Sequence, residues 1–201
     1  MLGDKKMISK KKSRTNTRKL VIIGALGGIS IFLGLTGLGS ITLPIFRLTI
    51  MHIPVIIGAI LEGPVVGMSI GLIFGLFSMY QNFTAPVLNS FIFLNPIIAL
   101  IPRVLVGIVA YYTFSFLFKK LKKVGISAAI SAILATLTNT IGVLGLTYLI
   151  YLDRYAKALD ISKEAVSGTL LTIGLTNGVP EALVSALITI PIITTMKKII
   201  K

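Results

Sequence analysis

Long apolar stretches alternate with short polar ones along the chain after Lys19. A helix needs roughly 20 mainly apolar residues to cross a bilayer, with a range of about 17 to 25. Six stretches approach or exceed this length: residues 20–38, 48–61, 64–80, 95–118, 126–151 and 170–196. The second and third are short, so each is expected to borrow residues from its flanks. The pattern predicts an all-α integral membrane protein, in which residues 19–201 form one domain of six transmembrane helices.

The charged residues are few and strongly basic, and they are grouped. Only 13% of the 201 residues are charged, against about a quarter in a soluble domain, while the net charge is +14. The basic side chains gather in residues 5–19, 119–123 and 197–201. A nucleic-acid-binding protein would spread them over one folded face, so no nucleic-acid partner is expected. The chain has no cysteine, which excludes disulfides and thiolate metal sites.

The three basic clusters also predict the orientation. With six spans between them, all three fall on one side of the membrane, which the positive-inside rule assigns to the cytoplasm together with both termini. Residues 1–18 are expected to form a disordered basic tail that contacts anionic lipid. The apolar stretch after this tail is long for a signal-peptide core, and we interpret it as a retained first span in a prokaryotic cell membrane.

Six polar residues lie within the predicted spans or at their starts: His52, Asn95, Arg103, Asn139, Asn177 and Glu181. At 1.5 Å per residue, Arg103 and Glu181 both lie roughly 24 Å above the cytoplasmic lysines, and Asn139 lies about 20 Å above its helix start. A charge facing lipid costs at least about 2.5 kcal/mol, so Arg103 and Glu181 should face a cavity or each other. The sequence leaves open whether they bind a ligand or form a buried ion pair.

The start of the last span is interrupted by polar and helix-breaking residues. Asn177 or Gly178 can cap a helix whose first turn contains Pro180, and such a helix would point free N–H groups into the bundle. The alternative is a proline kink without a functional consequence. His52 is the sole histidine, so it cannot supply half of a two-histidine metal site, and taken alone it indicates a packing residue more than a ligand. No phosphate-binding loop is present, so ATP would have to be bound by another subunit.

Four motifs together resemble the substrate-binding S components of energy-coupling factor (ECF) transporters. They are TIMHIPVIIGAILEGPVVG (residues 49–67), NPIIALIPRVLVG (95–107), LTNTIGVLG (137–145) and NGVPEAL (177–183). Within that family the chain is most similar to the members assigned to pantothenate. The resemblance implies a vitamin site near the outer surface, with Arg103, Asn139, Asn177 and Glu181 at expected ligand contacts. It also implies docking on a membrane T subunit through small residues of the first helix, here Gly24 and Gly28 in place of alanines, and two ATPase subunits.

The predicted function is therefore vitamin capture by a non-enzymatic importer subunit that holds no cofactor itself. Arg103 would face the pantothenate carboxylate, Asn139, Asn177, Glu181 and Asn95 would bind its polar groups, and His52 would help to cover the site. Hydroxymethylpyrimidine and pyridoxine remain alternative ligands. An intramembrane enzyme would need more histidines or carboxylates than the spans contain. A ligand-free scaffold disagrees with polar residues at one depth, and an open channel disagrees with an inner half that is almost purely apolar.

Overall fold

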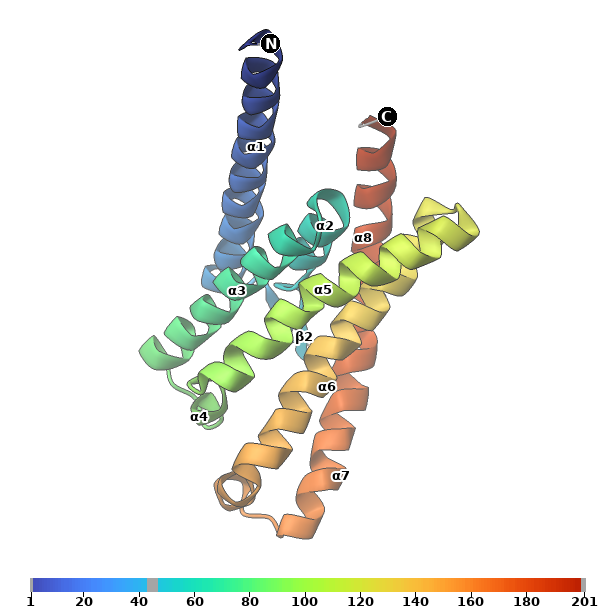
Figure 1. The fold of residues 1–201 in the computed structure, drawn as a ribbon. Helices are drawn as coiled ribbons and strands as arrows, with labels where there is room; N and C mark the ends of the chain where they lie inside the picture. The colour runs from blue at the N-terminus through green and yellow to red at the C-terminus, as the bar shows by residue number, and fades with distance from the viewer. Residues whose placement is uncertain (1, 43–46, 200–201) are drawn as a thin grey trace.

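The computed structural model describes the backbone of residues 2–42 and 47–199 (Figure 1). Its elements, in chain order, are α1 (Leu2–Leu35), β1 (Ser40–Thr42), β2 (Arg47–Thr49), α2 (Ile53–Glu62), α3 (Pro64–Thr84), α4 (Ser90–Phe93), α5 (Pro96–Leu121), α6 (Val124–Leu159), α7 (Lys163–Ile173), the π-helix η1 (Gly174–Gly178) and α8 (Val179–Ile199). Residues 43–46, which lie between the first two predicted spans, and the last two residues of the C-terminal basic cluster lie outside this description. The fold is a helical bundle with one short antiparallel hairpin.

The long helices run back and forth between two ends of the bundle, and both chain ends lie at the same end (Figure 1). Within the described residues, five helical stretches are long and apolar enough to cross a membrane. Of the six predicted spans, the second is the one without a helix of this length: its helix, α2, has only 10 residues and is about 15 Å long. The structure therefore does not confirm a sixth full span over residues 48–61. Their first part forms the hairpin and a turn, and the helix begins only at Ile53, beside Pro54.

Two further helix limits differ from the sequence prediction. The structure continues α1 back to Leu2, through the segment expected to be disordered, because a lysine-rich sequence has no intrinsic preference against helix. The apolar, membrane-length part of α1 is Thr17–Leu35. Most of residues 152–164, which follow the fifth predicted span and were expected to lie in a loop outside the membrane, are also helical. Their first part extends α6 beyond a kink at Tyr151, and a left-handed residue, Asp160, ends that helix shortly before Ser162 caps α7.

Close backbone packing joins α3 to α5 through glycines one turn apart. A Cβ atom on Gly75 would stand 2.6 Å from the Ala99 carbonyl oxygen, and one on Gly71 would collide with the Arg103 carbonyl. Gly67 meets Gly107 in the same way. Small residues at this spacing let membrane helices approach closely, where apolar burial gives no advantage over lipid. The glycines therefore fix the position of the α5 segment around Arg103.

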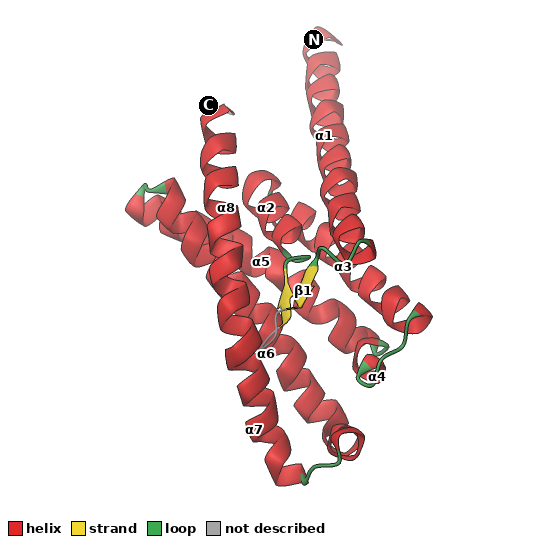
Figure 2. Ribbon diagram, turned by 180° about the vertical axis from the view of Figure 1, so that it is seen from behind, coloured by secondary structure: helices red, strands yellow, loops and turns green. Residues whose placement is uncertain are grey.

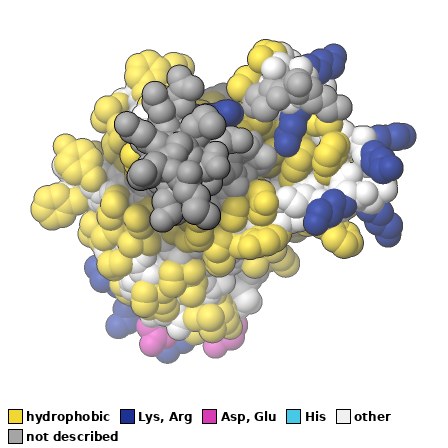
Figure 3. All heavy atoms as spheres, turned by 45° about the horizontal axis from the view of Figure 1, so that its top comes forward, with side chains coloured by type: hydrophobic (Ala, Val, Ile, Leu, Met, Phe, Trp, Pro, Cys, Tyr) yellow, Lys and Arg dark blue, Asp and Glu magenta, His cyan; other side chains and the backbone are white. Residues whose placement is uncertain are grey.

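The outward surface of the helices is largely hydrophobic, as expected for side chains in contact with lipid. In Figure 3 apolar side chains cover much of the visible face, and Lys and Arg side chains gather toward its edges. The short hairpin lies in the middle of the bundle, between α1 and α8, when the molecule is seen from behind (Figure 2). Its strands pair Ser40 with Thr49 and Thr42 with Arg47. This position brings the chain from the hairpin to α2 next to several of the predicted ligand residues.

Candidate functional site

The last residue of β2 and the three residues that lead from it to α2 contact three other helices, and we call residues 49–52 the crossing segment. The Thr49 backbone N–H donates to Glu181 Oε1 on α8 at 2.7 Å. His52 Nε2 lies 2.9 Å from Thr136 Oγ1 on α6, and Ser30 Oγ of α1 donates to the Met51 carbonyl at 3.2 Å. His52 and Thr136 are fully buried. His52 thus connects the crossing segment to α6 through its own side chain. Glu181 connects the same segment to α8 by accepting from its backbone.

Arg103 is held by a carbonyl that the preceding residue leaves free. Pro102 has no N–H, so it cannot bond the Ile98 carbonyl four residues earlier in α5. Arg103 Nη1 donates to that Ile98 oxygen at 2.6 Å. The guanidinium also lies 5.5 Å from the centre of the Phe74 ring and 5.1 Å from that of Phe93. These contacts place a buried cation, 4% exposed, against aromatic faces on α3 and α4.

Arg103 and Glu181 do not form the buried ion pair that the sequence left open. The salt bridges among the described residues join Arg18 to Glu62 and Lys163 to Asp153. Arg103 instead binds the backbone of its own helix, whereas Glu181 binds the crossing segment through the Thr49 N–H. The two side chains therefore have separate contacts in this structure, and Arg103 Nε has no hydrogen-bond partner among the described residues.

The last span is not broken at Asn177. Its backbone stays helical from Lys163 to Ile199, with five residues in the wider π form. The prediction of a helix start with free N–H groups at Asn177 or Gly178 was therefore wrong. Pro180 lacks an N–H and its ring collides with the carbonyl four residues earlier, and the wider π turn accommodates both effects without unwinding the helix. Gly178 packs on the side chain of Thr140 on α6, the residue that follows Asn139. The π-helical turn therefore lies close to the part of α6 that carries Asn139.

Asn95 has a structural role at the start of α5. Its side-chain oxygen accepts from the Ile97 N–H at 3.0 Å, which caps the helix. Its amide nitrogen donates to the Tyr151 hydroxyl at 3.2 Å, at the kink of α6. Asn95 lies eight residues before Arg103, about 12 Å along the helix. The structure gives its polar atoms protein partners and does not bring it to the crossing segment.

Three of the predicted residues present buried polar atoms with no hydrogen-bond partner among the described residues. These atoms are His52 Nδ1, Arg103 Nε and Asn139 Oδ1, which come from the start of α2, from α5 and from α6. Buried polar groups in native proteins are nearly all paired, and an unpaired one costs about 1 to 3 kcal/mol. One acceptor, one donor and one histidine nitrogen are the kinds of group that a small polar ligand can pair with.

Sequence reasoning missed several residues that position this set. Thr136 holds His52, the Thr49 backbone holds Glu181, and the rings of Phe74 and Phe93 flank Arg103. Thr136 lies one helical turn before Asn139, which was the available clue. A backbone N–H carries no mark in the sequence, so the contact at Thr49 could not be found there. In the described part of the chain, no group of His, Asp and Glu side chains could hold a metal ion.

Gly24 and Gly28 lie on the outer side of α1. A Cβ atom on either would have no neighbour within 4 Å, whereas one on Gly27 would meet Ile73 of α3 at 2.9 Å. The two faces of α1 are thus used differently: Gly27 packs inward, and the four-residue spacing of Gly24 and Gly28 is open on the outside.

Comparison with known proteins agrees with this architecture. Residues 18–193 match the family model described as ECF transporter, substrate-specific component. The chain is 30% identical over 164 residues to the pantothenic acid transporter PanT of Lactococcus lactis subsp. cremoris, covering 75% of this chain and 78% of that protein. It is 37% identical over 103 residues to the pantothenate transporter PanT of Leuconostoc mesenteroides, covering 49% and 50%. The chain is a multi-pass membrane protein and belongs to the family of ECF transporter substrate-specific components.

Proposed function

We propose that this chain captures pantothenate and delivers it inward as the substrate-binding subunit of an ECF importer. The names of two relatives motivate the choice of vitamin. The observation that carries the site is the set of unpaired buried atoms on His52, Arg103 and Asn139. A ligand bonded to them would satisfy groups that the protein alone leaves without partners.

Pantothenate has the groups that such a site requires. Its carboxylate would accept from the guanidinium of Arg103, and a charge-assisted bond of this kind is about twice as strong as a neutral one. Asn139 Oδ1 would accept from a hydroxyl or from the amide N–H, and His52 Nδ1 would bind a second hydroxyl in either tautomer. Asn177 and Glu181, which the last span carries, would complete the set of ligand contacts. Because Glu181 also binds the Thr49 N–H, ligand contact there would be linked to the position of the hairpin.

The rest of the importer is proposed from the family and from the outer face of α1. Gly24 and Gly28 would contact the T subunit, because a surface of small residues allows another membrane helix to approach closely. Two ATPase subunits would supply the energy, and this chain would hold no cofactor. The basic clusters at the end with both termini favour a cytoplasmic location for that end.

Calorimetric titration of the purified, detergent-solubilised chain with pantothenate tests the proposal. One-to-one saturable binding is expected, and Arg103→Ala should abolish it while far-UV circular dichroism stays helical. Arg154→Ala is the matched control. That arginine also lies over an aromatic ring, 4.4 Å from the centre of Phe91, but on the exposed end of α6. Equal affinity of the wild type and Arg103→Ala would remove Arg103 from the site.

Parallel titrations with hydroxymethylpyrimidine and pyridoxine test the choice of vitamin. Neither has a carboxylate, so both should bind much more weakly if Arg103 selects the ligand. Tight binding of one of them, with no heat from pantothenate, would keep the importer role and replace the substrate. No binding of any of the three by folded protein would contradict the vitamin assignment.

A further inference from the structure

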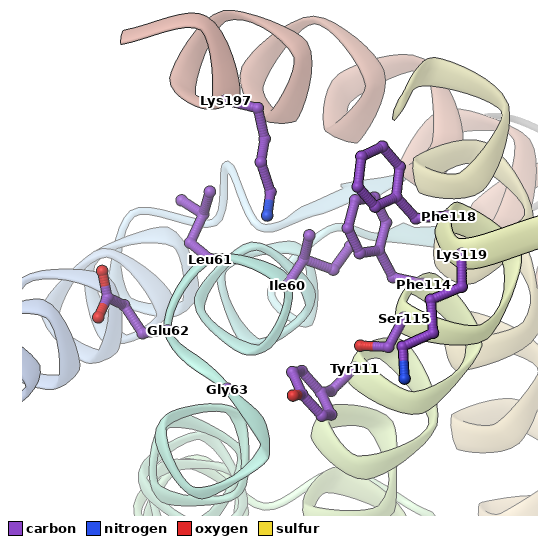
Figure 4. Close-up of a pocket in the computed structure, with 10 residues that line it drawn as sticks. All are labelled: Ile60, Leu61, Glu62, Gly63, Tyr111, Phe114, Ser115, Phe118, Lys119 and Lys197. Carbon is purple, nitrogen blue, oxygen red and sulfur yellow. The ribbon is translucent and has the colours of Figure 1, made fainter. Parts of the chain in front are cut away.

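A partly polar cavity lies at the end of the bundle that carries both chain ends. It has a volume of about 380 Å³ and lies between α2, α5 and α8 (Figure 4). Its polar lining comes from Glu62, Tyr111, Ser115, Lys119 and Lys197. None of the six predicted ligand residues lines it, and Tyr111 is about 12 Å further along α5 than Arg103. This cavity is therefore separate from the vitamin site.

The cavity is positively charged because its one carboxylate is already neutralised. Glu62 Oε1 lies 2.6 Å from Arg18 Nη2 on α1, and its side chain points away from the two lysines (Figure 4). Lys119 and Lys197 form no salt bridge with any described residue. Lys197 extends from α8 into the space beside α2, where its Nζ lies 5.2 Å from the centre of the Phe114 ring. Two ammonium groups from different helices thus border one cavity.

Three further features of the lining suit an anion that carries an apolar part. Gly63, which lines it, precedes the first residue of α3, and the N-terminal end of a helix carries a partial positive charge with unbonded N–H groups. Tyr111 and Ser115 add hydroxyl donors. Apolar side chains of Ile60, Leu61 and Phe118 line the same cavity. Ammonium groups, a helix start and hydroxyls suit a phosphate group, and the apolar lining suits the glycerol and upper acyl carbons attached to it.

We propose that this cavity binds the phosphate head group of an anionic phospholipid from the leaflet at this end. The location supports a lipid source, since Lys119 and Lys197 lie in the last turns of α5 and α8, where membrane helices reach the head-group layer. Inorganic phosphate has the same charged group but lacks the apolar part. The lysines also complement the helix C-termini, yet Lys120 and Lys198 do the same without lining the cavity. Those two residues provide matched controls.

Native mass spectrometry of the full chain in a neutral detergent tests the proposal, with phosphatidylglycerol, phosphatidylcholine and inorganic phosphate as probes. One phosphatidylglycerol should be retained in preference to phosphatidylcholine. Lys119→Gln and Lys197→Gln should each weaken its binding about fivefold, equivalent to ~1 kcal/mol per lysine near a lipid surface. Lys120→Gln and Lys198→Gln should stay within about twofold of the wild type. Circular dichroism would verify that all four variants remain helical.

The phosphate arm separates the two sources of the anion. Competition by inorganic phosphate only at high concentration supports a lipid ligand, because the apolar lining then adds affinity. Equal affinity for inorganic phosphate and for phosphatidylglycerol supports the phosphate site but overturns its lipid occupant. Equal retention of the two lipids, or equal losses in the cavity variants and the controls, would overturn the site itself. These results are independent of pantothenate binding, so failure here leaves the proposed function intact.

Discussion

Replacement of Gly71 by alanine is the sharpest test of how the bundle positions Arg103. A Cβ atom at Gly71 would lie 2.9 Å from the Arg103 carbonyl carbon and closer still to its oxygen, whereas ordinary contacts of this kind begin at 3.4 Å. Both neighbours are backbone atoms and cannot rotate away. The two helices must therefore separate by at least about 0.5 Å, a gap that already forfeits a quarter of the attraction between neighbouring atom pairs. Overpacking of this kind costs about 1 to 3 kcal/mol.

Gly145→Ala on α6 is the matched control, because its Cβ would have no neighbour within 4 Å. Alanine favours a helix over glycine by up to about 1 kcal/mol, and both variants receive this gain. The free energy of unfolding of Gly71→Ala should thus lie about 1 to 3 kcal/mol below that of Gly145→Ala. The chain contains no tryptophan, so far-UV circular dichroism during denaturant titration in detergent is the suitable assay.

Pantothenate titration of the same two variants gives the second readout. Gly71→Ala should bind more weakly, since it shifts the backbone of Arg103, whereas Gly145→Ala should match the wild type. Equal unfolding free energies for the two variants would refute the close-packing argument. Equal affinities, with the expected difference in stability, would show that the separation of α3 and α5 does not reach the ligand.

Three other changes test separate contacts. Thr136→Val should lower the unfolding free energy by about 1 to 3 kcal/mol in the same denaturant assay, because it leaves His52 Nε2 buried without a partner; an unchanged value would show that this bond contributes nothing. Asn95→Ala should destabilise the chain by about 1 kcal/mol through loss of the cap, with little change in pantothenate affinity, and a large loss of affinity would restore Asn95 to the site. Gly28→Leu should leave the isolated chain as stable as the wild type but reduce copurification with the T subunit, and normal copurification would place that contact elsewhere.

The sequence predicted the helical membrane architecture and the burial of the ionisable residues inside the apolar stretches, because both follow from the cost of polar groups in hydrocarbon. His52, Arg103 and Glu181 are all at most 9% exposed, as their positions in apolar stretches required. It did not predict the short α2, since hydrophobicity alone does not distinguish a helix from the buried crossing segment that precedes it. The π-helix was missed for a related reason: a proline indicates a local disturbance without specifying its form.

The prediction of an almost purely apolar inner half was also incomplete. Ser127, Ser131, Ser185 and Thr189 are fully buried there. Ser127 and Ser131 donate to backbone carbonyls four residues earlier in the chain, so a helix can carry them at little cost in an apolar region. The lysine-lined cavity was missed because Lys119 and Lys197 are far apart in the sequence, and their clusters alone indicated only the side of the membrane.

The contact between Arg103 and Ile98 also affects the biogenesis of the protein. A helix enters the bilayer before it packs against its neighbours, and an arginine within its apolar part then carries a cost that reaches about 2.5 to 3.5 kcal/mol at the helix centre. In α5 the carbonyl freed by Pro102 offers that arginine a hydrogen-bond acceptor within the same segment, before any partner helix or ligand is present. Pro102→Ala would restore the competing N–H. It should therefore make insertion of the isolated α5 segment by the translocon less efficient, even though alanine is the better helix former. The adjacent proline and arginine thus form a unit that carries its own charge compensation into the membrane.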